Sequence, residues 1–128
     1  MNQLTSRING LKRVCHDTSF GTRLMIAEGI VMSKLTYLIT LWGGAQQYLL
    51  NALQVQQLSA ARVVCGFGCW GWSRSRLLQK VGWLSVKQLV FFHTVMQAHK
   101  TISTRVPKAL HQFLSNNYPY RTSEQQLA

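Results

Sequence analysis

The feature that most limits the fold is a long apolar run from Leu24 to Trp42, which carries two charges, Glu28 and Lys34. Its length is close to what a helix needs to cross a bilayer. Each charge would cost about 2.5 to 3.5 kcal/mol near the bilayer centre, and no apolar stretch of about 18 residues lies between charges. We therefore predict a helix in the middle of a water-soluble bundle, where neighbouring helices cover most of its sides.

Helical periodicity continues along the chain and predicts an all-α bundle of about five or six helices. Capping residues mark several ends: Asp17, Thr18 or Ser19 before the second helix, Gly82 after the fourth, and a Ser85–Gln88 capping box at the start of the fifth. Gly29 is a possible division of the second helix. The helices are expected at about residues 3–16, 20–42, 46–65, 74–81, 86–104 and 108–114.

The chain is long enough for one hydrophobic core without disulfide or metal support. We expect a helical nucleic-acid-binding domain over residues 1–114 and a polar, disordered tail over residues 115–128. No strand pattern, internal repeat or low-complexity tract stands out.

The charge is strongly unbalanced, with 14 Lys and Arg residues against three acids and a formal net charge of +11. A polyanionic partner would relieve the resulting repulsion, so nucleic acid is the first expectation and an anionic membrane surface the second. The number of cysteines is odd, and no secretory leader pattern is seen at the N-terminus. We expect an intracellular protein, nuclear or cytoplasmic.

Catalytic chemistry finds little support in the residue types. Asp17, Glu28 and Glu124 are too few and too scattered for a two-metal site or a carboxylate acid–base pair. Glu28 is expected to pair with a nearby Arg or Lys. Cys65 and Cys69 followed by His93 and His99 have zinc-ligand chemistry, but two histidines six residues apart on a helix cannot face one ion. We predict no catalytic residue, no metal and no cofactor.

The segment "CWGWSRSRLLQKVGW", from Cys69 to Trp83, is the most informative local chemistry. If Ser73 caps a helix, Arg74 and Arg76 lie in its first turn, where the helix dipole disfavours cations unless an anion binds. Trp70 or Trp72 would then offer a stacking face for a base. The alternative, which we favour on frequency, is that the tryptophans belong to the core and the arginines are solvated.

Two polar stripes also allow two interpretations, one without and one with a contact to nucleic acid. Gln54 and Gln57 lie on the apolar stripe of the third helix, where their amides either bond across the bundle, the favoured reading, or face a nucleic-acid groove. His93, Gln97 and Lys100 line one face of the fifth helix, which we interpret as its solvated face in preference to a backbone-contacting one.

Four segments, in this order and at similar separations, resemble a known family. They are "SKLTYLITLWGG" (residues 33–44), "LQVQQLSAAR" (53–62), "GWLSVKQLVFFHTVMQAHKT" (82–101) and "VPKAL" (106–110). Together they resemble the region that follows the polymerase palm in reverse transcriptases of jockey-like non-LTR retrotransposons. The resemblance covers about residues 7–114, and the ordered set is specific although each piece alone is weak.

The resemblance implies the thumb and post-thumb part of an RNA-directed DNA polymerase whose catalytic Tyr-x-Asp-Asp motif lies on a palm outside this sequence. Gln54, Gln57 and Arg62 match marked positions of that family, whereas Leu58 and Ser59 replace its usual Asn-Lys and remove a cation. The implied role is to grip an RNA/DNA or DNA duplex, next to the palm, without polymerase activity of its own and without a membrane partner.

Contacts to phosphates are expected to dominate such binding and to be insensitive to sequence. The basic side chains expected to make them are Arg7, Lys12, Arg13, Lys34, Arg62, Arg74, Arg76, Lys80, Lys87 and Lys100, with Trp70 and Trp72 for stacking. One rival is a relic or repurposed helical module that binds another protein or itself. A weaker rival is a peripheral membrane protein.

Overall fold

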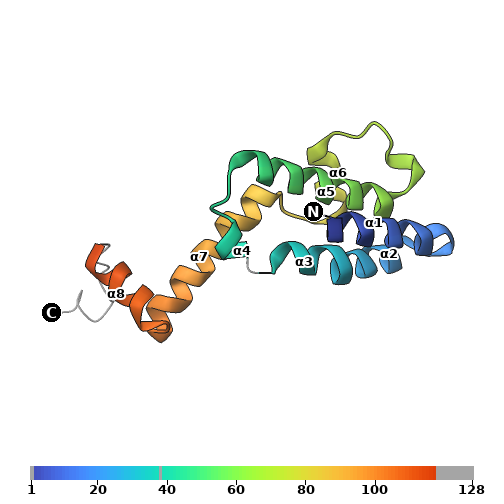
Figure 1. The fold of residues 1–128 in the computed structure, drawn as a ribbon. Helices are drawn as coiled ribbons and strands as arrows, with labels where there is room; N and C mark the ends of the chain where they lie inside the picture. The colour runs from blue at the N-terminus through green and yellow to red at the C-terminus, as the bar shows by residue number, and fades with distance from the viewer. Residues whose placement is uncertain (1, 38, 118–128) are drawn as a thin grey trace. The chain divides into compact units, whose positions relative to one another are not determined.

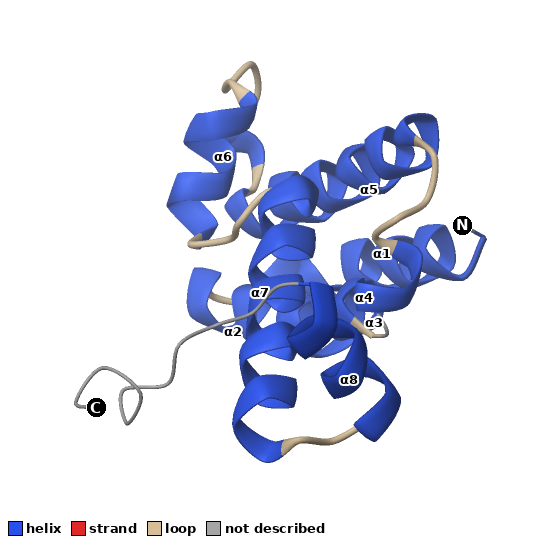
Figure 2. Ribbon diagram, turned by 90° about the vertical axis from the view of Figure 1, so that its left-hand side faces the viewer, coloured by secondary structure: helices blue, strands red, loops and turns tan. Residues whose placement is uncertain are grey.

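A computed structural model describes residues 2–37 and 39–117 of the chain. The described residues form helices, turns and loops with no strand, so the predicted all-α class is confirmed (Figure 2). The chain divides into two compact units, residues 1–91 and 92–128. Within the described part, no helix has the length and apolarity that crossing a membrane would need.

The helices follow one another with short connections (Figure 1). Three short helical segments, η1, η2 and η3, join or interrupt the α-helices. The elements in chain order are α1 (Asn2–Val14), η1 (Cys15–Asp17), α2 (Phe20–Ala27), η2 (Glu28–Met32), α3 (Ser33–Thr36), α4 (Ile39–Trp42), α5 (Gln47–Cys65), η3 (Phe67–Cys69), α6 (Arg74–Val81), α7 (Val86–Thr104) and α8 (Lys108–Asn117).

The long second helix differs from the prediction. It is helical from α2 through α3, with a π-helical turn at η2, and Gly29 lies inside that turn without ending the helix. The break comes later, at Tyr37, whose backbone is extended at φ −62° and ψ 121°. The indole Nε1 of Trp42 donates to the Tyr37 carbonyl at 3.0 Å. This bond satisfies a carbonyl at the helix end that has no partner within the helix.

The core of the first unit is built from the apolar stripes of α1, α2, α3, α5 and α6. The expected first helix is present as α1 and η1, and its four apolar residues at helical spacing, Leu4, Ile8, Leu11 and Cys15, are all buried. Figure 1 shows α1 beside both the α2–α3 segment and α5. The core includes Leu4, Ile8, Leu11, Cys15, Ala27, Val31, Leu35, Leu58, Ala61, Val64, Leu77, Val81 and Trp83.

The predicted caps are present. Ser19 Oγ accepts from the Thr22 N–H, and Ser73 Oγ accepts from the Arg76 N–H, both at 3.4 Å. Gly82 ends α6 in the left-handed conformation with φ 72°. At the start of α7 the Ser85 N–H donates to Gln88 Oε1 at 2.9 Å, and the Gln88 N–H donates to Ser85 Oγ at 3.4 Å, which completes the capping box.

The glutamines of α5 are structural. Gln54 and Gln57 are 7% and 0% exposed, and Gln54 Nε2 donates to Gln57 Oε1 at 2.7 Å. Gln57 Nε2 also donates to the Leu84 carbonyl, and the Val86 N–H donates to Gln54 Oε1. The amides therefore hold the α6–α7 connection against α5, and the interpretation that they face a nucleic-acid groove is wrong.

Glu28 has a different partner from the predicted cation. Its Oε1 accepts a hydrogen bond at 3.2 Å from the indole Nε1 of Trp83, which is 9% exposed. A large aromatic side chain brings an N–H that must be satisfied when it is buried, and a carboxylate is a strong acceptor for it. One of the few acids of the chain thus fixes a core tryptophan.

The second unit contains the later part of α7 and the helix α8, whose end at Asn117 lies beyond the predicted limit of 114. Of the stripe expected to be solvated, Lys100 is exposed, and His93 and Gln97 are half-buried. Phe92, Val95 and Met96 are instead about half exposed, at 49%, 49% and 50%. The first residues of the predicted tail, 115–117, belong to α8, and residues 118–128 lie outside the described part.

Candidate nucleic-acid interface

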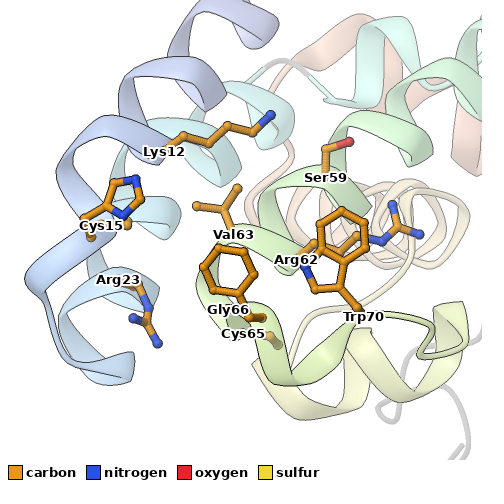
Figure 3. A pocket seen from close by; sticks show the side chains of 11 residues that line it. Lys12, Cys15, Arg23, Ser59, Arg62, Val63, Cys65, Gly66 and Trp70 are labelled. Atoms are coloured by element: carbon orange, nitrogen blue, oxygen red, sulfur yellow. The ribbon is translucent and has the colours of Figure 1, made fainter.

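The first unit contains a pocket of about 570 Å³ that is bordered by α1, η1, α2, α5 and the loop through η3. Four basic side chains line it: Lys12, His16, Arg23 and Arg62. No carboxylate is among its lining residues, so no acid competes there for an incoming anion. Figure 3 shows Lys12 and Arg23 on one side of this pocket and Arg62 with Trp70 on the other.

Two of the four basic residues of the pocket lie at the C-terminal ends of α-helices. Lys12 lies in the last turn of α1, and Arg62 lies in the last turn of α5. A cation in the last turn of a helix interacts favourably with the helix dipole, by about 0.3 to 1 kcal/mol. His16 follows Lys12 by four residues, which places both on one side of the α1–η1 segment.

Arg23 differs from the other basic residues because its guanidinium is used by the fold. Its Nε donates to the Val64 carbonyl at 2.9 Å and its Nη1 donates to the Thr18 carbonyl at 3.0 Å. The last carbonyls of a helix have no partner within the helix, so the first bond caps the end of α5. Arg23 adds positive charge to the pocket wall while holding α2 to α5.

Two exposed aromatic side chains border the pocket. Phe67 and Trp70 are 84% and 77% exposed, and both line it. They belong to one tight turn, in which the Trp70 N–H donates to the Phe67 carbonyl at 3.3 Å. Buried Cys69 anchors this turn, and its Sγ donates to the Cys65 carbonyl at 3.7 Å. Gly66 and Gly71 supply the positive φ angles, 76° and 83°, at its two ends.

The basic residues of α6 are arranged differently. The Arg76 guanidinium lies 4.1 Å from the ring centroid of Trp72, and the Lys80 ammonium lies 5.3 Å from that of Phe20. Trp72 is half-buried and packs against the core. The Arg76 guanidinium covers one face of the Trp72 ring, and the ring also contacts the core. Trp72 is therefore better described as a structural tryptophan than as a stacking surface for a base.

The remaining predicted cations are spread over other parts of the chain. Arg7 donates from Nη1 to the Ile30 carbonyl at 3.0 Å, and the Lys34 ammonium lies 5.8 Å from the Tyr37 ring centroid. The others are exposed residues outside the pocket: Arg13 on α1, Arg74 on α6, and Lys87 and Lys100 on α7. Of the predicted set, the structure brings together Lys12, Arg62 and Trp70.

Among the basic and aromatic residues of the pocket, the sequence did not predict His16, Arg23 and Phe67. The four-residue spacing from Lys12 is the signal that could have found His16. Phe67 stands between two glycines in "GFG", a setting that leaves an aromatic residue little to pack against. Arg23 carries no comparable signal, because its place depends on how α2 packs against the end of α5.

Two cysteines, Cys15 and Cys65, line the pocket, and burial raises the pKa of both thiols. Burial raises the pKa of the Cys65 thiol to about 11, with further contributions from its hydrogen bond to Cys69 and from the charge of Cys69, against the lowering effect of Lys80 and Arg23. Burial also raises the pKa of Cys15. In the described part of the chain, no cluster of three or more His, Cys, Asp or Glu residues is arranged to hold a metal.

Comparisons with models of protein families, with curated proteins and with solved structures gave no significant match.

Proposed function

We propose that the first unit binds the phosphate backbone of nucleic acid, and that Lys12 and Arg62 are its main contacts. The observation that carries the proposal is the pocket itself, with basic side chains from α1, η1, α2 and α5 and no acid among its lining residues. Lys12 and Arg62 are exposed, and neither side chain is held by an ion pair or hydrogen bond to another described residue. Both are available to an external anion.

The segment resemblance supplies the biological setting of the proposal. We infer that the chain is the non-catalytic thumb and post-thumb part of a jockey-like non-LTR reverse transcriptase, which grips the primer–template duplex beside a palm. Arg62, a marked position of "LQVQQLSAAR", lines the pocket, which supports this assignment. Gln54 and Gln57 of the same segment contribute packing instead.

The test is a titration of fluorescently labelled RNA/DNA hybrid with the full chain over a series of salt concentrations. Binding through phosphates releases counterions, so the affinity should fall steeply as salt rises. Lys12→Ala with Arg62→Ala should weaken binding by about tenfold to a hundredfold and lower the salt slope by about 1 for each cation removed. An affinity that does not change with salt contradicts the proposal.

A matched control removes the same charge elsewhere. Arg105 and Lys108 are exposed residues of the second unit, and Arg105 has φ 57°, a conformation that glycine adopts without strain. The variant Arg105→Gly with Lys108→Ala should keep most of the affinity. Equal losses in the two double variants would mean that only the net charge matters, and that the pocket is not the site.

A second candidate, a protein-interaction module, is favoured by one observation. Phe92, Val95 and Met96 follow one another at helical spacing on α7 and are about half exposed, although side chains of this kind are usually covered. Sedimentation of the chain alone over a range of concentrations tests self-association. A monomer at all concentrations would exclude a second copy of the chain as the partner.

A further inference from the structure

We infer that the pocket accepts an unpaired nucleotide of a single strand, with its base on Trp70 and the flanking phosphates near Lys12 and Arg62. The inference rests on the proposed function and goes further, since it names the form of nucleic acid that this site prefers. The observations behind it are the two exposed aromatic side chains, the turn that carries them and the size of the pocket.

The turn through η3 presents its aromatic residues to solvent. In a 3₁₀ turn, residues three apart lie on the same side, which places Phe67 and Trp70 together. Cys69 points inward between them and is 7% exposed. A turn that is anchored by its cysteine and exposes both neighbouring aromatic rings buries little apolar surface, so these rings contribute little to the fold.

Aromatic rings beside cations distinguish a single strand from a duplex. A duplex stacks its bases inside and offers a protein its phosphates, sugars and groove edges, whereas a single strand offers base faces. Stacking of a base on an aromatic side chain contributes about 1 to 3 kcal/mol. Trp70 and Phe67 can make that contribution only with an unpaired base, while Lys12 and Arg62 serve either form.

The volume of the pocket agrees with a ligand as small as one unpaired nucleotide. A volume of about 570 Å³ is in the range of pockets that hold small ligands. A B-form duplex, whose major groove alone is about 12 Å wide, can only lie across such an opening. The Ser59 hydroxyl of the wall already donates to the Val55 carbonyl at 3.0 Å, so we expect stacking and charge to dominate over reading of base edges.

The experiment measures fluorescence anisotropy of the full chain with three labelled probes of equal charge: an oligothymidylate, a duplex, and a base-free deoxyribose-phosphate strand. We expect the oligothymidylate to bind most tightly of the three. Trp70→Ala should weaken its binding by roughly tenfold. The same substitution should leave binding of the duplex and of the base-free strand nearly unchanged, and Trp70→Phe should retain most of the affinity.

Tyr48→Ala is the matched control, because Tyr48 is an aromatic residue of α5 that is 65% exposed and does not line the pocket. Equal affinity for oligothymidylate and duplex, or a Trp70→Ala effect no larger than that of Tyr48→Ala, overturns this inference and leaves the proposed phosphate binding in place. Failure of all three probes to bind overturns both. Thermal unfolding of each variant by circular dichroism shows whether it is folded.

Discussion

Two parts of the first unit combine arginine or lysine with tryptophan, and they use these residues in opposite ways. On α6, Arg76 lies 4.1 Å from the ring of Trp72, which packs against the core, and Lys80 lies over Phe20. At the pocket, Lys12 and Arg62 are exposed, and Trp70 is 77% exposed. The first set is engaged within the protein, and the second set is available.

The difference shows that residue types and spacing do not by themselves identify a binding site. In the sequence, the α6 segment has the denser pattern of arginine and tryptophan. In the structure, Arg76 and Lys80 of this segment lie over the aromatic rings of Trp72 and Phe20. The pocket collects its basic residues from four separate elements, which no local pattern shows. What separates the two regions is whether each polar or aromatic group already has a partner in the folded chain.

The largest expected effect is on stability and separates the two tryptophans. Trp72→Ala should lower the free energy of unfolding by about 2 to 3 kcal/mol, because it removes a half-buried ring from the core and leaves a cavity. Trp70→Ala should change it by less than about 0.5 kcal/mol, since the ring is mostly exposed. Urea unfolding of both variants measures this. Similar losses would mean that Trp70 is structural as well.

A smaller effect is expected for the cations of α6. Arg76→Ala with Lys80→Ala should lower the free energy of unfolding by about 1 to 2 kcal/mol, because two cation–π contacts are lost at about 0.5 to 1 kcal/mol each. Binding of nucleic acid should weaken by less than about threefold. Urea unfolding and an anisotropy titration of this variant give the two values. A large loss of affinity with unchanged stability would mean that Arg76 and Lys80 of α6 bind nucleic acid and do not stabilise the fold.

A further effect depends on pH and concerns Cys65, which lines the pocket and lies within the electrostatic influence of Lys80 from α6. Its pKa is about 11 in the folded chain, against an ordinary value of 9.0. Well below pH 9 the thiol is protonated in both states and its contribution to stability is complete. Between pH 9 and 11 only the unfolded chain ionises, so the stability should fall as pH rises.

Thermal unfolding between pH 8 and 11 measures this decline, and Cys65→Ala should show a smaller one. The difference between the variant and the natural chain is the quantity that counts, because contributions common to both cancel in it. Identical pH profiles would show that the Cys65 thiol ionises as readily in the folded chain as in the unfolded one.

Much of the fold was predictable because its signals are local. The cap at Ser73, the stop at Gly82 and the capping box from Ser85 to Gln88 each depend on residues a few positions apart, and each is present. The break at Tyr37 was not predicted, because the sequence around it remains apolar and lacks glycine or proline. Packing, not local preference, decides where such a helix ends.

The site was predictable only in part. Lys12, Arg62 and Trp70 were expected to bind nucleic acid, but nothing in the spacing of residues 12, 62 and 70 shows that they line one pocket. The exposure of Phe92 and Val95 on α7 was also missed, because an apolar stripe on a helix usually predicts a buried face. Both depend on contacts between segments far apart in the sequence.

The most direct test of the central claim compares salt dependence for the two regions. The affinity of the natural chain for RNA/DNA hybrid, plotted against salt on logarithmic axes, gives a slope that counts phosphate contacts. Lys12→Ala with Arg62→Ala should reduce the slope by about 2, and Arg76→Ala with Lys80→Ala should leave it nearly unchanged. A slope that falls for the α6 variant and stays constant for the pocket variant would contradict the claim.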